Sequence, residues 1–328
     1  MRFSLTTFGS LLALLASAAL AAEVSTVVDG LSNPCGIAVQ PGTGTIYVAD
    51  SGAGRVVRIV DGKAEAVITD FPADIYGKGP KYQIGAFGLA FLYKDTLVVG
   101  GGGLPDGEEL LRVYALPADG ESLKAADMKE SFSLAADDET KGEGNFYALA
   151  LTDNAIYVTC NGDDTKGWVS RAKVKKGKVG PFERYLPTKE ATEVDAPVGI
   201  TVSPRGELVV GQMGEITIPE DGLLTFYNPK SKKMLLNLET GLSDITALAY
   251  SPKGLLYALD FSWFDTSKGG LFRIDKDGND AVKTTKIAPL TKPTSMAFGK
   301  DGALYITVIG EGEDASKTGS LVKITDKL

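Results

Sequence analysis

Six segments of this 328-residue chain follow one pattern. Each has a small residue inside a short apolar run, then a turn rich in Pro or Gly, then a second apolar run. The small residues are Gly36, Gly88, Ala148, Gly199, Ala247 and Ser295, so successive copies lie 52, 60, 51, 48 and 48 residues apart. A period of about 50 residues with several short strands per copy is typical of a β-propeller. The sequence therefore predicts an all-β fold, a six-bladed β-propeller.

The apolar run that opens each copy alternates small and large residues. In the first copy, Gly36 and Ala38 share one face of the predicted strand, because successive strand side chains point to opposite faces. Innermost strands of six blades crowd around one axis, so a large face must meet a small one. A two-sheet sandwich would also show alternation, but it gives no reason for six matching copies. We expect four strands in the first copy, at 34–40, 45–49, 55–60 and 64–69.

The two ends of the chain complement each other. The sixth copy supplies three predicted strands, at 294–298, 303–308 and 320–325, and the chain then stops at Leu328. The segment 23–31 resembles the fourth strands of the other copies. We expect this N-terminal strand to join the last blade, which closes the ring and removes an open sheet edge that would favour aggregation.

Residues 1–21 differ in composition from the rest of the chain. Arg2 precedes an apolar stretch at 11–20, and Ala19-Leu20-Ala21 has the small residues of a cleavage site. This arrangement is typical of a signal peptide, and the apolar stretch is too short for a membrane span, which needs about 20 residues. The sequence predicts one propeller domain at 22–328, exported to the periplasm or the cell exterior, with no membrane span.

The chain has no histidine. This excludes a Ser-His-Asp or Cys-His catalytic apparatus, a histidine-ligated zinc site and a haem attached through a CxxCH motif. We therefore expect no zinc and no haem. The two cysteines, Cys35 and Cys160, belong to copies one and three. That separation is too large for a disulfide, which needs Cα atoms within about 7 Å, so we expect two buried free thiols.

Acidic residues outnumber basic ones, with 42 Asp and Glu against 34 Lys and Arg and a formal net charge of −8. Such a surface repels nucleic acid and anionic lipid, so we expect neither as a partner. Acidic residues gather in the predicted loops between second and third strands, at 105–109, 163–164, Glu215, 220–221, Asp265 and 311–314. We expect a ligand to bind on this acidic loop face, although solvated loop charges would give the same pattern.

Four aromatic residues are predicted to lie on the same face. Tyr76 and Tyr82 belong to a connection longer than a blade needs, and Trp263 and Phe264 follow a second strand. Long connections in compact domains are often binding loops. Exposed rings there would suit a small molecule, a carbohydrate or a protein partner. The alternative is that these rings pack the loops together.

Oxygen-bearing side chains recur at the predicted mouth of the central channel. Asn33, Asn145 and Asp244 stand three residues before the small residue of alternate copies, and Asp50 and Asp260 follow second strands. Calcium takes about six to eight oxygen ligands from carboxylates, amides and water. These five residues are therefore our candidate Ca²⁺ ligands. The alternative is that each caps its own turn, as Asn and Asp commonly do.

A family resemblance supports the predicted fold. It is carried by the segments NPCGIAVQPGTGTIYVADSGAGRVVRI at 33–59 and APVGITVSPRGELVV at 196–210. Both resemble NHL-type repeats and the six-bladed propellers of the SMP-30/gluconolactonase-like superfamily, and they are similar to exported ScyD/ScyE-type proteins. The resemblance covers nearly all of 23–328 and implies the propeller, a fold that enzymes, binding modules and scaffolds share.

The resemblance also bears on function. SMP-30-like enzymes are understood to hold a central divalent metal with acidic and Asn side chains; Asn33 stands where their pattern has Glu, while Asn145 and Asp244 fit the pattern loosely. Our first hypothesis is therefore a non-catalytic binding module, and the alternative is a divalent-metal-dependent hydrolase of the lactonase type. A PQQ-type sugar dehydrogenase would normally need a catalytic histidine, which this chain lacks.

Overall fold

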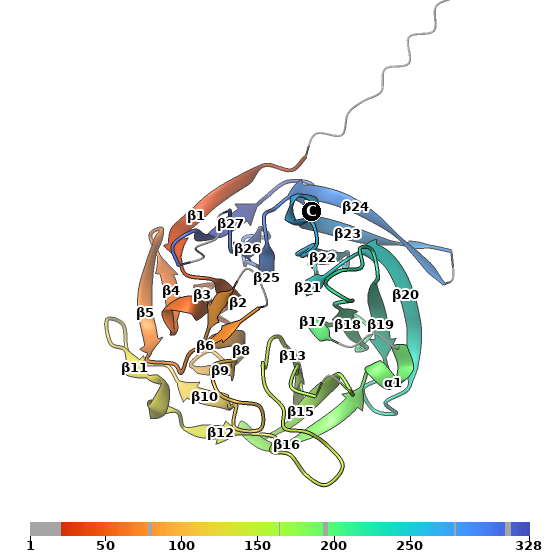
Figure 1. The fold of residues 1–328 in the computed structure, drawn as a ribbon. Coiled ribbons are helices and arrows are strands. Elements are labelled where there is room, and N and C mark those ends of the chain that lie inside the picture. The colour runs from red at the N-terminus through yellow and green to blue at the C-terminus, as the bar shows by residue number, and fades with distance from the viewer. Residues whose placement is uncertain (1–20, 78–80, 164, 193–195, 279, 312–315) are drawn as a thin grey trace, which may run out of the picture.

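Six sheets stand in chain order around a central axis, each with its first strand innermost (Figure 1). The fold is the six-bladed β-propeller expected from the repeats. The computed structural model describes residues 21–77, 81–163, 165–192, 196–278, 280–311 and 316–328. The predicted signal peptide at 1–21 lies outside the described residues except for Ala21.

Each blade has four antiparallel strands, which follow one another from the channel outward. The first three blades are β2 (Pro34–Val39), β3 (Ile46–Asp50), β4 (Arg55–Val60), β5 (Lys63–Thr69); β8 (Ala86–Tyr93), β9 (Thr96–Gly101), β10 (Leu111–Ala115), β12 (Glu130–Phe132); and β13 (Leu149–Thr152), β14 (Ala155–Thr159), β15 (Trp168–Lys175), β16 (Lys178–Pro187). The others are β17 (Pro197–Val202), β18 (Leu208–Gln212), β19 (Gly222–Tyr227), β20 (Met234–Leu242); β21 (Ile245–Tyr250), β22 (Leu256–Asp260), β23 (Gly270–Asp277), β24 (Ala281–Pro289); and β25 (Pro293–Phe298), β26 (Leu304–Val308), β27 (Gly319–Ile324), β1 (Val24–Leu31).

The small residues lie where neighbouring first strands touch. A Cβ atom added at Gly36 would overlap the carbonyl oxygen of Phe87 in the next blade. At Gly88 it would lie 2.7 Å from the carbonyl oxygen of Tyr147, and at Gly199 it would lie 3.1 Å from the Cα of Ala247. The small face of each of these strands therefore packs against the backbone of the next strand around the ring, which explains the spacing of the small residues.

Threonine hydroxyls form hydrogen bonds between neighbouring blades, close to these contacts of the first strands. The hydroxyl of Thr159 donates to the carbonyl of Val198 at 2.8 Å, and that of Thr246 donates to the carbonyl of Pro293 at 2.9 Å. Such a bond satisfies a buried carbonyl at the blade junction, where water has no access. Packing and hydrogen bonding thus hold the inner edges of adjacent blades together.

The N-terminal strand completes the last blade. β1 pairs antiparallel with β27, with Val24 opposite Ile324 and Leu31 opposite Gly319. The first strands of the last and first blades are joined as well, because the Thr294 hydroxyl donates to the carbonyl of Pro34 at 2.5 Å. The pairing is the one expected from the two chain ends.

Two short pairings were not foreseen. The long connection after the first blade forms a hairpin, β6 (Asp74–Tyr76) and β7 (Tyr82–Ile84), above the channel mouth. The two-residue strand β11 (Leu123–Lys124) crosses from the second blade and pairs parallel with β5 at the outer edge of the first. The hairpin lies over the channel end of the blades, and β11 covers the outer edge of the first blade. These strands are two or three residues long, which is too short to show a periodic sequence pattern.

Both cysteines are buried and free, which confirms the expectation that they do not form a disulfide. Within the described residues, no helix combines the length and the apolar character that a bilayer crossing requires.

The contact at Gly36 gives a direct test of blade packing. We expect Gly36→Ala to lower the free energy of unfolding by about 3 kcal/mol, because the new methyl group and the Phe87 carbonyl cannot occupy the same space without moving two blades apart. Gly180→Ala is the control, since a Cβ there has the carbonyl oxygen of Lys173 as its nearest neighbour, at 3.3 Å. Urea unfolding curves measure both. Equal midpoints would contradict the proposed role of the small residue.

Candidate functional site

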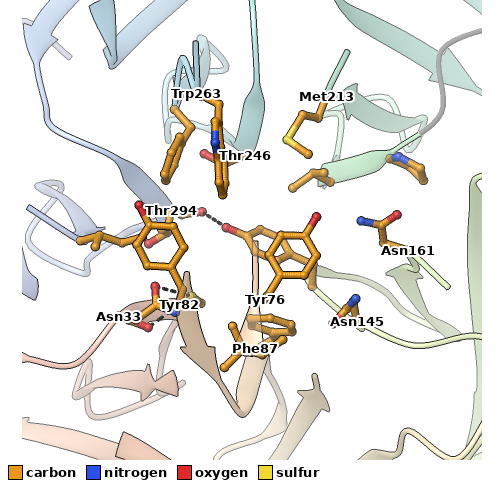
Figure 2. A pocket seen from close by; sticks show the side chains of 17 residues that line it. Asn33, Tyr76, Tyr82, Phe87, Asn145, Asn161, Met213, Thr246, Trp263 and Thr294 are labelled. Atoms are coloured by element: carbon orange, nitrogen blue, oxygen red, sulfur yellow. Dashed lines mark hydrogen bonds between the residues drawn. The ribbon is translucent and has the colours of Figure 1, made fainter. Parts of the chain in front are cut away.

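A cavity of about 90 Å³ opens at the mouth of the central channel, beneath the β6–β7 hairpin. Its 17 lining residues come from all six blades and the hairpin (Figure 2). The residue immediately before the small residue lines it in every copy: Cys35, Phe87, Tyr147, Val198, Thr246 and Thr294. The sequence repeat thus assigns one position per blade to the wall of this cavity.

The residue immediately after the small residue has a different environment. It lines a second cavity, of about 410 Å³, in all six copies: Ile37, Leu89, Leu149, Ile200, Leu248 and Met296. Tyr147 lines both cavities, and its hydroxyl donates to the carbonyl of Thr294 at 3.0 Å, from the third blade to the sixth. Tyr147 therefore lies across the channel and separates an aromatic upper cavity from a lower cavity lined mainly by aliphatic side chains.

Aromatic rings dominate one side of the upper cavity. Trp263 stacks on Phe261 with ring centroids 4.9 Å apart and an angle of 23° between the ring planes. Tyr82 meets the same indole ring edge to face, at 5.8 Å and 88°. These are the favoured geometries for aromatic pairs, so the rings hold one another in place. Tyr76 lines the cavity from the hairpin, whereas Phe264 is 63% exposed and lies on the outer rim.

The ionisable groups of the upper cavity that show a clear pKa shift are neutral at physiological pH. Burial raises the pKa of the Cys35 thiol to about 12 and the pKa of Tyr82 to about 12. Burial also raises the pKa of Tyr147 well above its usual range. No Asp, Glu, Lys or Arg is among the 17 lining residues. The wall therefore carries hydrogen-bonding groups without charge.

The carboxylates predicted as calcium ligands accept hydrogen bonds from their own surroundings. Asp50 accepts from the backbone N–H of Ser32 at 2.6 Å and from Arg55 Nε at 2.7 Å. Asp260 accepts from three backbone N–H groups, of Ser243, Asp244 and Ser262, at 3.2, 2.8 and 3.0 Å. These contacts match the turn-capping alternative.

Asp244 lies directly behind the cavity wall. Its carboxylate accepts a hydrogen bond from the backbone N–H of Trp263 at 2.5 Å. It therefore holds the loop whose indole ring lines the cavity, and it acts as a positioning residue. Among the described residues, no three His, Cys, Asp or Glu side chains gather where they could hold a metal ion. Calcium at this mouth stays a prediction, and Asp50, Asp244 and Asp260 do not form a shared carboxylate group.

The two asparagines of the predicted set line the cavity. Asn33 and Asn145 have positive φ angles of 45° and 47°, a conformation that Asn adopts more readily than most residues. The amide nitrogen of Asn33 donates to the carbonyl of Gln83 at 2.9 Å and so fixes the β7 strand of the hairpin. Asn145 instead faces the cavity beside Asn161, which sequence reasoning missed (Figure 2).

The acidic loop face is largely occupied by local contacts. Glu109 is fully buried and pairs with Arg112 at 3.2 Å. Asp221 accepts from the backbone N–H of Glu215 at 2.8 Å, and Asp265 caps the turn at Ser267. The predicted acidic positions 164 and 312–314 lie outside the described residues. The carboxylates of Glu109, Asp221 and Asp265 therefore stabilise their own loops.

Comparison with solved structures identifies proteins of the same fold. A gluconolactonase from Xanthomonas campestris matches with a TM-score of 0.61 and 16% identity, over 92% of this chain and 89% of that one. The soluble aldose sugar dehydrogenase of Escherichia coli matches at 0.62 and 15%, over 93% and 99%. A luciferin-regenerating enzyme matches at 0.59 and 13%, over 93% and 96%.

At these identities the likeness concerns the fold, which is the one implied by the sequence resemblance to SMP-30/gluconolactonase-like propellers. No protein-family model matches the chain, and no curated protein matches it significantly. The similarity to ScyD/ScyE-type proteins stays an expectation from the sequence.

Asp244 makes stability depend on pH. Burial raises its pKa from 3.8 to about 6, and Asp260 and Asp221 nearby add to the shift. The folded state then binds the proton more tightly than the unfolded state. This proton therefore stabilises the fold by about 3 kcal/mol below about pH 4, and the stabilisation is lost as the pH rises through about 6. We expect Asp244→Asn to reduce that pH dependence.

Urea unfolding at pH 4.5 and pH 7.5 measures the effect. Asp277→Asn, which changes an exposed carboxylate on β23, is the control and should retain the pH dependence of the original chain. An unchanged pH dependence in Asp244→Asn would contradict this assignment.

Proposed function

We propose that this propeller is a non-catalytic module that binds an uncharged, ring-containing small molecule in the upper cavity. The observation that carries the proposal is the composition of the wall, in which none of the 17 lining residues is Asp, Glu, Lys or Arg. Burying an ion in such a site would cost free energy without a countercharge to offset it. An uncharged ligand meets no such penalty.

The aromatic side of the cavity supports a ring as the bound group. Phe261, Trp263 and Tyr82 hold one another at fixed angles, so they offer pre-formed faces and edges to a flat ligand. Pre-formed, mostly apolar concavities with a few convergent polar groups are the usual form of small-molecule sites. A carbohydrate is a poorer occupant, because each of its hydroxyls would need a hydrogen-bond partner in a wall that has few to offer.

The same wall gives little support for catalysis. A general base must lie within hydrogen-bond reach of the proton it removes and must have a pKa near the working pH. The Cys35 and Tyr82 side chains do not meet that condition, since burial raises the pKa of each to about 12. Asp244, whose pKa is raised to about 6, is bound to the backbone of Trp263 behind the wall.

Toluene is a suitable probe for the proposed site, because it is an uncharged ring without hydrogen-bonding groups. We expect it to bind with a Kd of about 1 mM, measured by ligand-observed NMR titration. Trp263→Ala should weaken binding about tenfold by removing the stacked ring. Phe264→Ala changes the neighbouring exposed ring on the rim and should leave Kd within about twofold. Absence of toluene binding to the unmodified chain would overturn the proposal.

Lactone hydrolysis is the second candidate, and the fold neighbours described as gluconolactonases favour it. By the sequence resemblance it would require a divalent metal, for which the predicted Ca²⁺ ligands are Asn33, Asp50, Asn145, Asp244 and Asp260. We expect no hydrolysis of gluconolactone above the uncatalysed rate with Ca²⁺ or Mg²⁺ present. A rise in Tm on adding Ca²⁺ would support the predicted calcium site, whether or not hydrolysis occurs. Metal-dependent turnover abolished by Asp244→Ala would favour the enzyme over the binding module.

We also propose that the protein acts outside the cytoplasm. The charged start, apolar stretch and small-residue site within residues 1–21 support this. We expect the protein isolated from its own cells to begin at Ala22, and N-terminal sequencing tests it. A cell-derived protein that retains Met1 would contradict export by this route.

A further inference from the structure

We infer that the ligand of the upper cavity carries a carboxamide-like edge, an adjacent hydrogen-bond donor and acceptor, which Asn145 and Asn161 recognise together. This inference rests on the proposed function and narrows it from any uncharged ring to planar rings such as lactams, imides, aryl carboxamides and heteroaromatic amides.

The two amides lie side by side on one wall. The backbone N–H of Asn161 donates to the carbonyl of Gly144 at 3.1 Å, which brings residues 145 and 161 next to each other. Figure 2 shows both side chains on the same side of the cavity, away from Trp263 and Tyr82. Both residues are half-buried, so their amides remain open to a molecule in the cavity.

Other polar groups of the wall are used by the fold. The Asn33 amide binds the carbonyl of Gln83, and the hydroxyls of Thr246 and Thr294 donate to carbonyls of neighbouring blades. The Tyr147 hydroxyl likewise donates to the carbonyl of Thr294. The side-chain amides of Asn145 and Asn161 form no hydrogen bond within the described part of the chain, so they are available for a ligand.

A second polar group lies on the opposite side of the cavity. The hydroxyl of Tyr82 is buried and has no hydrogen-bond partner among the described residues, although the residue lines the cavity. A buried polar atom without a partner costs free energy, and the large majority of buried polar atoms in folded proteins have one. Because that hydroxyl is fully buried, a ligand in the cavity reaches it only if the ring of Tyr82 moves, and the amide pair is the polar group open to a ligand.

The chemistry of the amide pair selects the ligand edge. Each carboxamide offers one acceptor oxygen and two donor hydrogens. Two neighbouring carboxamides therefore match a group that presents a donor and an acceptor on adjacent atoms, as Asn does when it binds the edge of adenine through two bonds. A carboxylate presents two acceptors and a charge, and it lacks the donor.

Three probes with the same ring test the inference: benzamide, toluene and benzoate. We expect benzamide to bind about tenfold more tightly than toluene, which corresponds to the net gain from one or two hydrogen bonds. Benzoate should show no measurable binding. Asn161→Leu should remove the advantage of benzamide and leave toluene unchanged, and Asn145→Gly, which keeps the positive φ, should have the same effect. Asn237→Leu, on the exposed side of β20, is the matched control.

The outcomes separate the two proposals. If toluene and benzamide bind equally well, and Asn161→Leu affects neither, the amide pair is not a recognition element and the simpler binding function stands. If none of the three probes binds, both proposals fail. If benzoate binds as tightly as benzamide, the requirement for an uncharged ligand with a donor is wrong. Circular dichroism and Tm measurements establish that each variant is folded.

Discussion

The close contact between first strands of neighbouring blades is the constraint on which the rest of this structure depends. At Gly36 the next blade approaches so closely that its backbone carbonyl occupies the space of a side chain. Gly88 and Gly199 show the same approach to their neighbours. Because the contact recurs around the ring, it sets the distance between blades and hence the width of the channel. The interior of a protein is packed densely enough that one methyl group matters at such a point.

This packing decides where the larger side chains of the same strands go. Side chains alternate between the two faces of a strand. A strand whose small residues face the next blade therefore points its larger residues toward the channel. The positions on either side of each small residue then form two levels. The lower level is aliphatic in all six blades, from Ile37 to Met296, whereas the upper level includes Phe87, Tyr147 and Thr246. The residue that lines the upper cavity and the residue that lines the lower one are therefore two positions apart on the strand, with the small packing residue between them.

The repeats predicted the strands of the first and sixth blades to within one residue at each end, because the same alternation of small and large residues occurs in all six copies. Pairings as short as β11 have no such signal. The aromatic residues of the long connection, Tyr76 and Tyr82, were predicted on the acidic loop face, and the structure places them in the lining of the cavity at the channel mouth. The Asp residues were harder to interpret, since an Asp beside a turn can bind a cation or accept backbone N–H bonds, and Asp260 does the latter. Asn161 stands just beyond the second strand of its blade, a position from which Met213, Phe261 and Ile309 of other blades also line the cavity. The repeat could therefore have indicated it.

The tyrosine that crosses the channel has a consequence for exchange kinetics. Because Tyr147 is fixed to Thr294 on the far side, the upper cavity ends in a floor. A bound molecule must leave through the mouth by which it came, past the β6–β7 hairpin and the indole of Trp263. Residence time would then depend on the motion of that rim, and the rate of release could change through substitutions there without any change in the contacts made at the floor.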